Sequence, residues 1–401
     1  MIDLLIIADD LTGSLDAAIH FSKRGVKTAI FLQPEIDWNH IADDARVLVI
    51  HTNTRHLPPE QAYQIVQTCA AKAQQKHIPI LFKKIDSALR GCVCAELEAL
   101  LDGSGSDALF VLPSFPAGSR LCTNGIQHWN SIPIAQTAYG QDPLDPVRVS
   151  SVPQLLREQK KRAVHLVREA EPFTLRTGIT VFDAQSDETL RLRCRMLLRA
   201  QRPLLLAGCA GLADALAAEL DWSSESSPPL PQVERLLLIS GSLHQVSRAQ
   251  VAYAHTLGYP LFTFALSELE EAQAAEKVSA AFSRAPVVLV QTKSENGMIS
   301  VEQSRLCSQK LAKFTQKIYR RVQPEALAVF GGDTLLNISE MLFQNGLYPC
   351  NELAQGVPIS IARDQSGRSV LLISKSGGFG EESIIEQIAD YLLKQKRGVT
   401  I

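Results

Sequence analysis

The sequence predicts an α/β fold of two Rossmann-like domains whose sheets are mainly parallel. Three observations lead to this prediction. Apolar strand-like runs alternate with segments of helical periodicity along the whole chain, most of these runs are apolar without interruption, and a stretch rich in Ser, Pro and Glu breaks the pattern near residue 225. Uninterrupted apolar strands separated by helices are typical of a parallel sheet covered on both faces. A chain of 401 residues also exceeds what one compact core usually holds.

The first half of the chain contains strand and helix signals in alternation. The predicted strands are Leu4–Ala8, Thr28–Leu32, Val47–His51, Ile80–Lys83, Ala108–Leu112, Gly178–Phe182 and Pro203–Leu206. Helical spacing of apolar residues predicts helices at Ser14–Lys23, Pro59–Gln75 and Val93–Leu101. Parallel sheets carry their binding groups in the loops at the carboxyl ends of the strands, so functional residues are expected in those loops.

The pattern breaks at Trp222–Gln232, where serines and prolines favour extended backbone. We therefore predict a first domain at residues 1–222, a linker at 223–232 and a second domain at 233–401. Alternation resumes after the linker. The predicted strands there are Arg235–Ile239, Pro260–Ala265, Pro286–Gln291, Ala326–Phe330 and Ser369–Ser374, and the predicted helices are Gln245–Thr256, Ala272–Ser283, Val301–Arg321, Leu335–Gln344 and Ser383–Lys394.

The composition narrows the classes of function. The net charge is −2 and the sequence pI is near 6.5, so no basic excess exists to neutralise a nucleic-acid backbone. No apolar run approaches the roughly 20 residues that span a bilayer, and the first residues lack the basic segment of a signal peptide. The eight cysteines show no zinc-ligand spacing. These features predict a cytoplasmic protein that binds neither nucleic acid nor membrane.

Two adjacent carboxylates follow the first predicted strand. Asp9 and Asp10 come directly after Leu4–Ala8, in a turn where Thr12 or Ser14 can cap the next helix. One aspartate alone could simply brace the turn. Two neighbouring carboxylates repel each other and need hydroxyl, cation or metal partners. The pair is therefore a candidate for binding a substrate hydroxyl and accepting its proton.

Cations follow the next strands on the same edge of the predicted sheet. Arg55 lies in the loop after Val47–His51, and the loop after Ile80–Lys83 reads Lys84-Ile-Asp-Ser-Ala-Leu-Arg-Gly91. Arginine matches a carboxylate with two parallel hydrogen bonds, and lysine acts as a point charge. A small ligand with one carboxylate and several hydroxyls would suit these cations together with the acid and hydroxyl of the loop. The alternative for Lys83 and Arg90 is that they are solvated charges that flank helices.

Three glycine turns precede helices in the second half. They are Ser240-Gly-Ser242, Gly331-Gly-Asp-Thr334 and Lys375-Ser-Gly-Gly-Phe-Gly380. Without side chains the backbone can approach an anion, and the free amides of a helix N-terminus favour phosphate. One such turn is weak evidence, but three in one domain predict nucleotide binding. No Walker sequence and no Gly-x-Gly-x-x-Gly after the first strand is present.

In this order, the motifs resemble the four-carbon acid sugar kinase family, which includes kinases of D-threonate, D-erythronate and 3-oxo-tetronate. The resemblance extends over essentially the whole chain. Its carriers are Ala8-Asp-Asp-Leu-Thr-Gly13, Thr54-Arg55, Lys84–Gly91, Ser240–Ser242, Gly331–Thr334 and Lys375–Gly380. One departure is Ala88, where family members usually have threonine, and the identity of the acid therefore stays open.

The resemblance implies an N-terminal acid-sugar domain, a C-terminal ATP domain and phosphorylation of a terminal hydroxyl. It assigns the acid sugar to Asp9, Asp10, Arg55, Lys84, Ile85, Asp86 and Ser87, and the strand-end cations add Arg90. It assigns ATP to the glycine turns, namely Ser240, Ser242, Gly331, Gly332, Asp333, Thr334, Gly377, Gly378, Phe379 and Gly380. Asp9 or Asp10 would orient or deprotonate the attacking hydroxyl, Mg²⁺ would accompany ATP, and an inter-domain active-site cleft would close around both substrates.

Two other functions are compatible with the pattern. One is an NAD(P)-dependent oxidoreductase or lyase that acts on a hydroxy acid, and the other is a two-domain acid-sugar sensor without activity. The sequence leaves open which four-carbon acid and stereoisomer is used, which aspartate is the base, which residues bind metal, and whether the chain forms a homodimer.

Overall fold

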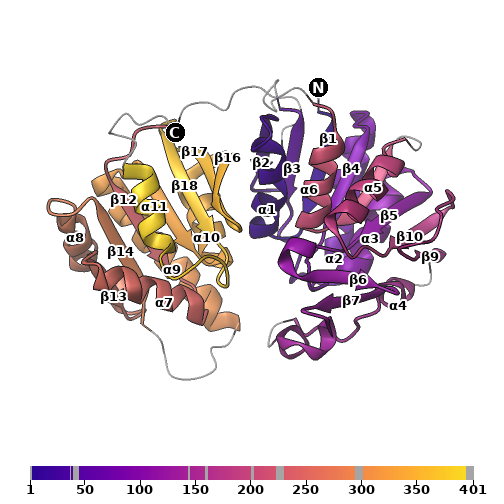
Figure 1. Ribbon diagram of the computed structural model, residues 1–401. Coiled ribbons are helices and arrows are strands. Elements are labelled where there is room, and N and C mark those ends of the chain that lie inside the picture. The colour runs from indigo at the N-terminus through magenta and orange to yellow at the C-terminus, as the bar shows by residue number, and fades with distance from the viewer. Residues whose placement is uncertain are drawn as a thin grey trace. The chain divides into compact units, whose positions relative to one another are not determined.

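The computed structural model describes residues 2–36, 38, 45–142, 145–158, 161–199, 203–222, 230–293 and 301–393. The chain divides into two compact units, Met1–Ser226 and Ser227–Ile401 (Figure 1). Each unit is an α/β structure with its own sheet and its own core. Of the predicted linker at 223–232, residues 223–229 lie outside the described residues.

The main sheet of the first unit is parallel throughout. Its strands are β1 (Leu4–Ala8), β2 (Thr28–Phe31), β3 (Val47–His51), β4 (Ile80–Lys84), β5 (Ala108–Leu112), β9 (Val164–Val167), β10 (Gly178–Phe182) and β11 (Leu204–Gly208). Their order in the sheet is β2-β3-β1-β4-β11-β5-β10-β9. The uninterrupted apolar runs of the sequence therefore form a sheet that is buried on both faces, as predicted.

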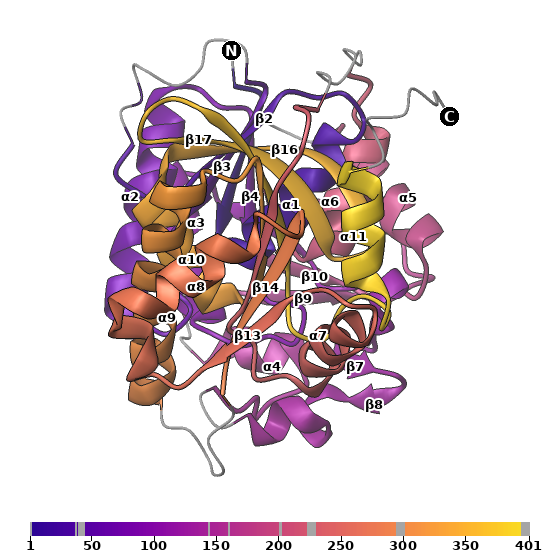
Figure 2. The same cartoon turned by 90° about the vertical axis from the view of Figure 1, so that its left-hand side faces the viewer.

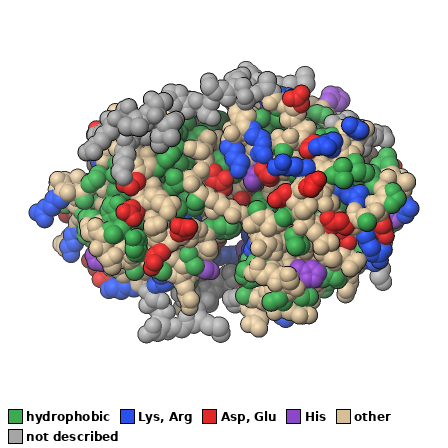
Figure 3. All heavy atoms as spheres, viewed as in Figure 1, with side chains coloured by type: hydrophobic (Ala, Val, Ile, Leu, Met, Phe, Trp, Pro, Cys, Tyr) green, Lys and Arg blue, Asp and Glu red, His purple; other side chains and the backbone are tan. Residues whose placement is uncertain are grey.

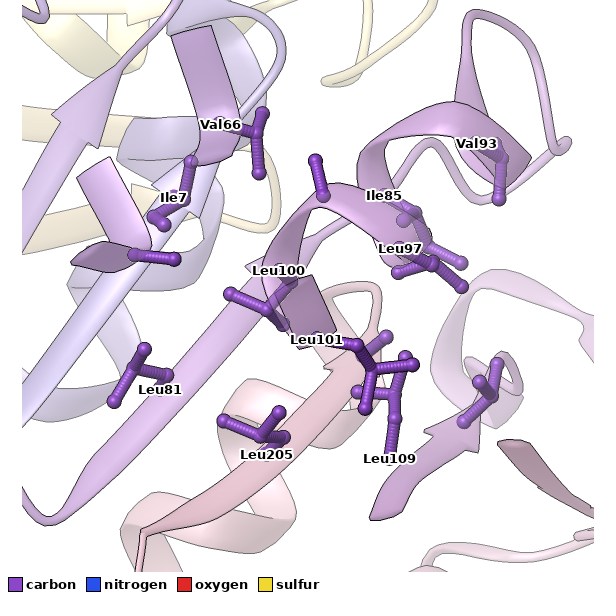
Figure 4. Packing of buried hydrophobic residues seen from close by; sticks show 14 of the residues in the cluster. Ile7, Val66, Leu81, Ile85, Val93, Leu97, Leu100, Leu101, Leu109 and Leu205 are labelled. Carbon is purple, nitrogen blue, oxygen red and sulfur yellow. The ribbon is translucent and has the colours of Figure 1, made fainter. Parts of the chain in front are cut away.

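Helices cover both faces of this sheet. The first face carries α1 (Leu11–Ser22), α6 (Ala210–Glu219) and α5 (Asp187–Leu197), which pack side by side, whereas α2 (Pro59–Gln75) and α3 (Val93–Ser104) pack together on the other face (Figure 1). Figure 4 shows the core on the second face, where Leu100 of α3 lies on the side of the strand residues Leu81 and Leu205 and Leu97 lies beside Ile85. Helix α3 ends at Gly105, whose φ of 68° suits glycine.

The strand order places a topological switch point between β1 and β4. The connection from β1 through α1 leads to β2 on one side of β1, and the connection from β4 through α3 leads to β5 on the other side. The connections that leave the two neighbouring strands therefore diverge, and the carboxyl ends at such a switch point are where α/β proteins bind ligands. The acidic turn after β1 and the basic loop after β4 both leave the sheet at this switch point.

The first unit also contains elements that the sequence reading did not assign. A small antiparallel sheet is formed by β6 (Arg120–Thr123), β7 (Ile126–Trp129) and β8 (Ile132–Pro133). Strand β9, helix α4 (Val152–Arg157) and helix α5 were likewise missed. Short 3₁₀ helices lie at Pro116–Gly118, Ile134–Gln136 and Ala138–Gln141, and another occurs in the second unit at Glu268–Glu270.

The sheet of the second unit is mixed. Its strands are β12 (Leu236–Ser240), β13 (Leu261–Phe264), β14 (Val287–Thr292), β15 (Ala326–Phe330), β16 (Phe343–Ala354), β17 (Val357–Asp364) and β18 (Ser369–Lys375). They lie in the order β13-β14-β12-β15-β18-β17-β16. Strands β12 to β15 and β18 are parallel, whereas β17 is antiparallel to both of its neighbours β16 and β18. A second switch point lies between β12 and β15, because their connections lead to opposite sides.

The helices of the second unit also form two layers. Helices α8 (Ala272–Ala281), α9 (Val301–Val322) and α10 (Gly332–Leu342) lie on one side of the sheet, and α7 (Gln245–Thr256) and α11 (Ile384–Leu393) on the other, as Figure 2 shows. The apolar faces of α7 and α11 cover the strands with Val251, Ile385 and Ile388. These faces explain why the predicted helices formed there.

The region after α10 corrects one prediction. The helix expected at Leu335–Gln344 ends at Leu342, and Phe343 begins the long strand β16 of the antiparallel hairpin with β17. The sequence did not predict this hairpin. It adds antiparallel strands to a sheet that was expected to be mainly parallel. Residues such as Asn345, Gly346 and Pro349 interrupt the apolar alternation of β16 and explain why it was not recognised as a strand.

No helix among the described residues is long and apolar enough to cross a membrane. On the face of the molecule seen in Figure 3, acidic and basic side chains are interspersed. This mixture agrees with the net charge of −2.

Candidate functional site

The turn after β1 forms the start of helix α1. Asp10 is the N-cap residue, and its Oδ1 accepts a hydrogen bond from the amide of Gly13 at 3.0 Å. A Cβ atom at Gly13 would lie 2.4 Å from Asp10 Oδ1 and 3.0 Å from Lys84 Nζ, so only glycine fits between these two groups. Asp10, which follows β1, and Lys84, at the end of β4, therefore lie on either side of Gly13 in the first turn of α1.

The guanidinium of Arg55 contacts three aspartates of the first unit. Its Nε donates to Asp9 Oδ2 at 2.7 Å, and its Nη atoms lie 3.0 Å from Asp10 Oδ2 and 2.8 Å from Asp10 Oδ1. Asp86 Oδ1 lies 3.5 Å from Arg55 Nη2. Because the protein's own carboxylates occupy its donors, Arg55 orients the acids and has few directions left for a substrate carboxylate.

The free oxygen of this cluster belongs to Asp9. The side chain of Asp9 is 2% exposed, and its Oδ1 is buried without a hydrogen-bond partner among the described residues. Burial alone would raise the pKa of Asp9, but attraction by Arg55 and Lys83 outweighs it and lowers the pKa. Asp9 is therefore a carboxylate at neutral pH with one oxygen available to accept a proton or a hydroxyl hydrogen bond.

Lys83 and Lys84 are adjacent, both buried, and differ in their partners. Lys83 Nζ lies 3.2 Å from Glu96 Oε2 of α3, with its side chain fully buried. Lys84 Nζ donates to the carbonyl of Ile85 at 3.0 Å and forms no salt bridge with any described carboxylate. The period of two along β4 turns the lysines to opposite faces. One ammonium therefore has a carboxylate at salt-bridge distance, and the other has none among the described residues.

The loop after β4 is held by Asp86. Its Oδ2 accepts the amide of Ala88 at 3.0 Å and Arg90 Nε at 3.0 Å, and Leu89 adopts a positive φ of 67° that non-glycine residues rarely take. Burial would raise the pKa of Asp86, but Arg55 and Arg90 lower it far below the usual value. Asp86 and Arg90 thus shape the loop that presents Ser87.

We expect the first unit to lose stability as the pH falls below about 4. The folded-state pKa values of Asp9 and Asp86 are lowered, so their ionisation stabilises the fold above the unfolded pKa of about 3.9 and this contribution disappears on acidification. Thermal unfolding measured from pH 7 to pH 3 should show a steep decline below pH 4. An Asp86→Asn variant should show a shallower decline, and equal slopes would contradict this assignment.

In the second unit, the three glycine turns converge at the carboxyl ends of the parallel strands. A Cβ at Gly331 would lie 3.2 Å from the amide nitrogen of Ser242, and a Cβ at Gly377 would lie 2.9 Å from Ser242 Oγ. The amide of Gly331 also donates to the carbonyl of Lys375 at 3.0 Å. The turns after β12, β15 and β18 therefore meet at one edge of the sheet, where the strand order places the turn after β15 in the middle.

A cavity of about 380 Å³ opens beside two of these turns. Its walls are Gly241–Leu243 after β12, residues 265–266 after β13, residues 292–293 at the end of β14, Gly331–Thr334, and Gln303, Ser304, Cys307 and Ser308 of α9. Apolar walls next to amide-lined glycine turns suit a ligand with a flat ring and phosphates. The cavity lies at the switch point between β12 and β15.

The other ATP residues expected from the sequence lie around this cavity. Ser240 is buried at the end of β12, and the loop Gly377–Gly380 borders Ser242 without being part of the cavity wall. The ring of Phe379 packs on Gly356 in the β16–β17 turn, where a Cβ would lie 2.5 Å from the ring. In the first unit, the side chain of Ile85 belongs to the core (Figure 4), so only its backbone could contribute to a site.

Comparisons with known proteins also find two domains in the chain. Residues 4–216 match the family model of a sugar-binding N-terminal domain, and residues 237–385 match that of a nucleotide-binding C-terminal domain. The chain is 26% identical to a D-threonate kinase of Salmonella typhimurium, over 95% of this chain and 96% of the relative. It is 27% identical to a D-erythronate kinase of Heliobacterium modesticaldum, over 98% of each chain. It is 25% identical to a 3-oxo-tetronate kinase of Brucella melitensis, over 94% and 93%.

The chain belongs to the four-carbon acid sugar kinase family. It is accordingly a phosphotransferase that acts on four-carbon acid sugars, and the resemblance inferred from the motifs is confirmed. Two solved structures share the fold at 19% identity. A Salmonella typhimurium protein matches with a TM-score of 0.81 over 98% of this chain and 100% of that chain, and a Haemophilus influenzae protein matches with 0.76 over 97% and 100%.

Several polar residues beside the kinase motifs escaped the sequence reading. Glu96 is 1% exposed, and Thr54 Oγ1 donates a hydrogen bond to its carboxylate. Burial raises the pKa of Glu96, and repulsion by Asp9 adds to this effect, whereas Lys83 opposes it. His51 Nδ1 lies 3.1 Å from the carbonyl of Leu32 and therefore carries the proton, while Nε2 has no partner among the described residues. Burial lowers the pKa of His51. A glutamate in line with Val93 and Leu97 on an apolar helix face was the available signal for Glu96.

Several residues of the cavity wall were also missed. Among them, Thr292 ends β14 and Lys293 follows it, so the same strand-end rule that identified the glycine turns would have identified these two. Among the described residues, no cluster of three or more His, Cys, Asp or Glu side chains could hold a metal ion.

Proposed function

We propose that this kinase transfers the γ-phosphoryl group of ATP to a terminal hydroxyl of threonate, erythronate or an oxo-tetronate by in-line displacement. The observation that supports the acid-sugar half is the ammonium of Lys84, which is 4% exposed and without a described carboxylate within salt-bridge distance. A buried charge without a directly bound counter-ion is costly, and Lys84 has only the more distant attraction of Asp9 and Asp86. An anionic group of the substrate is the partner that would compensate it.

The roles of the first unit follow from the contacts of its side chains. The substrate carboxylate would bind Lys84, and its hydroxyls would bind the free Oδ1 of Asp9 and the hydroxyl of Ser87. Arg55 keeps Asp9 ionised and in place. Asp9 is then the better candidate for the base that takes the proton of the attacking hydroxyl, because both oxygens of Asp10 already accept hydrogen bonds.

ATP would bind at the glycine turns of the second unit, with its phosphates near Ser242 and the Gly331–Thr334 turn. The donors there fit a magnesium ion that arrives with the nucleotide. Asp333 supplies one carboxylate and Ser242 and Thr334 supply hydroxyls at the cavity wall, and Mg²⁺ commonly takes one or two protein oxygens besides phosphates and water. Such an ion neutralises charge on the phosphates. Transfer further requires the two units to close over their substrates, and the inter-domain cleft stays a prediction.

A coupled assay of ADP release tests the proposal. Purified protein with ATP and Mg²⁺ should turn over at least one member of a panel of D- and L-threonate, D- and L-erythronate and 3-oxo-tetronates, and mass spectrometry should locate the phosphate on the terminal oxygen. Thermal unfolding with ATP, NAD⁺ or NADP⁺ separates the oxidoreductase alternative, which predicts stabilisation by the dinucleotides. Binding of an acid sugar with no turnover of any panel member would contradict the proposal in favour of a sensor.

A further inference from the structure

Lys375 is a buried lysine at the end of β18, just before the last glycine turn. It is 2% exposed, and its Nζ lies 4.7 Å from the centre of the Phe330 ring. No salt bridge joins it to a described carboxylate. Instead, Nζ contacts four oxygens: Ser247 Oγ at 3.0 Å and the carbonyls of Ser376 at 3.1 Å, Gly377 at 3.2 Å and Phe379 at 3.1 Å.

This ring of carbonyls determines where the amides of the turn point. In a trans peptide the N–H group is directed opposite to the preceding carbonyl. Because the carbonyls of residues 376, 377 and 379 point toward Nζ, the N–H groups of Gly377, Gly378 and Gly380 point away from it. None of these three N–H groups has a hydrogen-bond partner among the described residues. Successive free amides of this kind form a concave site for an anion.

We propose that Lys375 is a positioning residue that holds the Gly377–Gly380 turn with its amides directed at a phosphate of ATP. The inference rests on the proposed binding of ATP at the glycine turns and adds a residue that acts through the backbone. A second anchor of the same turn is Gln250 of α7, whose Nε2 donates to the carbonyls of Phe379, Gly380 and Glu381 at 3.1, 2.8 and 2.9 Å. Gln250 is uncharged and does not titrate, which makes it the matched control.

The protonated form of Lys375 is the one that can organise the turn. An ammonium has three N–H donors for the four oxygens, whereas a neutral amine has two donors and directs a lone pair at a carbonyl. Burial lowers the pKa of Lys375 to about 8. The elements packed against it contribute Ser247, Gln250 and the Phe330 ring. The titratable residues next to the turn are His244, beside Gly377, and Glu381, which follows Gly380, and neither pairs with Nζ.

The sign of the pH effect follows from linkage. A bound phosphate favours the ammonium and raises the pKa of Lys375, so nucleotide affinity is full below the pKa of the free protein and declines as the pH rises above about 8. We therefore expect the KM for ATP to rise between pH 8 and pH 9.5, whereas the KM for the acid sugar should change little over this interval.

Three variants test the inference in the full-length protein. Lys375→Met should raise the KM for ATP at pH 7.5 at least tenfold, leave the KM for the acid sugar within twofold, and remove the rise in KM for ATP above pH 8. Gln250→Met should raise the KM for ATP but keep that rise, because the lysine is still present. Lys375→Arg should restore part of the affinity without the change above pH 8. Thermal unfolding of each variant checks that it is folded.

Several outcomes would overturn the inference. One is a Lys375→Met protein with the KM for ATP of the parent, and another is a parent protein whose KM for ATP is constant from pH 7.5 to pH 9.5. If Lys375→Met does not fold, the comparison of the parent with Gln250→Met across pH decides. Calorimetric titration with ADP provides a readout that does not need turnover. A protein that binds ADP with this pH dependence but phosphorylates no acid sugar refutes the proposed function and keeps the role of Lys375, and a protein that binds no ADP refutes both.

Discussion

Lys84→Met is expected to lower kcat/KM for the acid sugar by about 10²- to 10³-fold without lowering the unfolding temperature. The ammonium of Lys84 is buried and forms no salt bridge with a described carboxylate, so its removal breaks no direct ion pair and costs the free protein only the more distant attraction to Asp9 and Asp86. The loss of a charge-assisted contact to the substrate is about 3–4 kcal/mol at a buried site. Steady-state kinetics measures the loss of kcat/KM, and thermal unfolding of the same preparation measures the unfolding temperature.

The neighbouring lysine supplies the control. Lys83→Met removes the partner of the buried Glu96 and should destabilise the protein by about 3–5 kcal/mol, because one charge of a buried pair is left behind. The double variant Lys83→Met with Glu96→Gln should recover most of that stability. If Lys84→Met destabilised the fold as much as Lys83→Met, or kept full activity, the assignment of Lys84 to the substrate anion would be refuted.

Asp9→Asn is expected to lower kcat by about 10³-fold, within the usual range for the loss of a general base. Asp9 holds the one unpartnered carboxylate oxygen of the acid cluster, and an amide in its place cannot accept the proton of the attacking hydroxyl. The fold should persist, because the asparagine oxygen can still accept from Arg55 Nε. Single-turnover kinetics separates this loss of chemistry from a loss of binding.

Asp10→Asn is the matched variant. Asp10 caps helix α1 and accepts from Arg55 with both oxygens, so the exchange should cost about 1 kcal/mol of stability and reduce kcat by roughly tenfold or less, through the position of Asp9. The sequence left either aspartate as the base. A severe loss in Asp10→Asn together with near-normal turnover in Asp9→Asn would reverse the assignment.

Much of the fold was predictable because local signals agreed with the tertiary structure. Strands such as Leu4–Ala8, Val47–His51 and Ala326–Phe330 were predicted with their observed bounds, since uninterrupted apolar runs between helices leave few alternatives. The elements that were missed, such as β6–β8 and the β16–β17 hairpin, carry mixed patterns. Their conformation depends on neighbours that are distant in the sequence.

The candidate site also contains features that the sequence predicted and features that it did not. The strand-end rule located Asp9, Asp10, Lys84 and the three glycine turns, because parallel strands end at a common edge of the sheet. It could not show which groups would neutralise one another. Lys83 and Lys84 look alike in the sequence, and only the packing of α3 gives the first an acid partner.

The sequence by itself determined the family, the α/β class and the positions along the chain where chemistry is concentrated, since these depend on residue order and on the periods of helix and strand. The tertiary structure decided that Arg55 is occupied by three carboxylates, that Asp9 keeps a free oxygen, and that Lys375 draws carbonyls inward. These properties depend on distances between atoms of separate elements. Electrostatic and hydrogen-bond partners are set by such distances, and a linear pattern does not contain them.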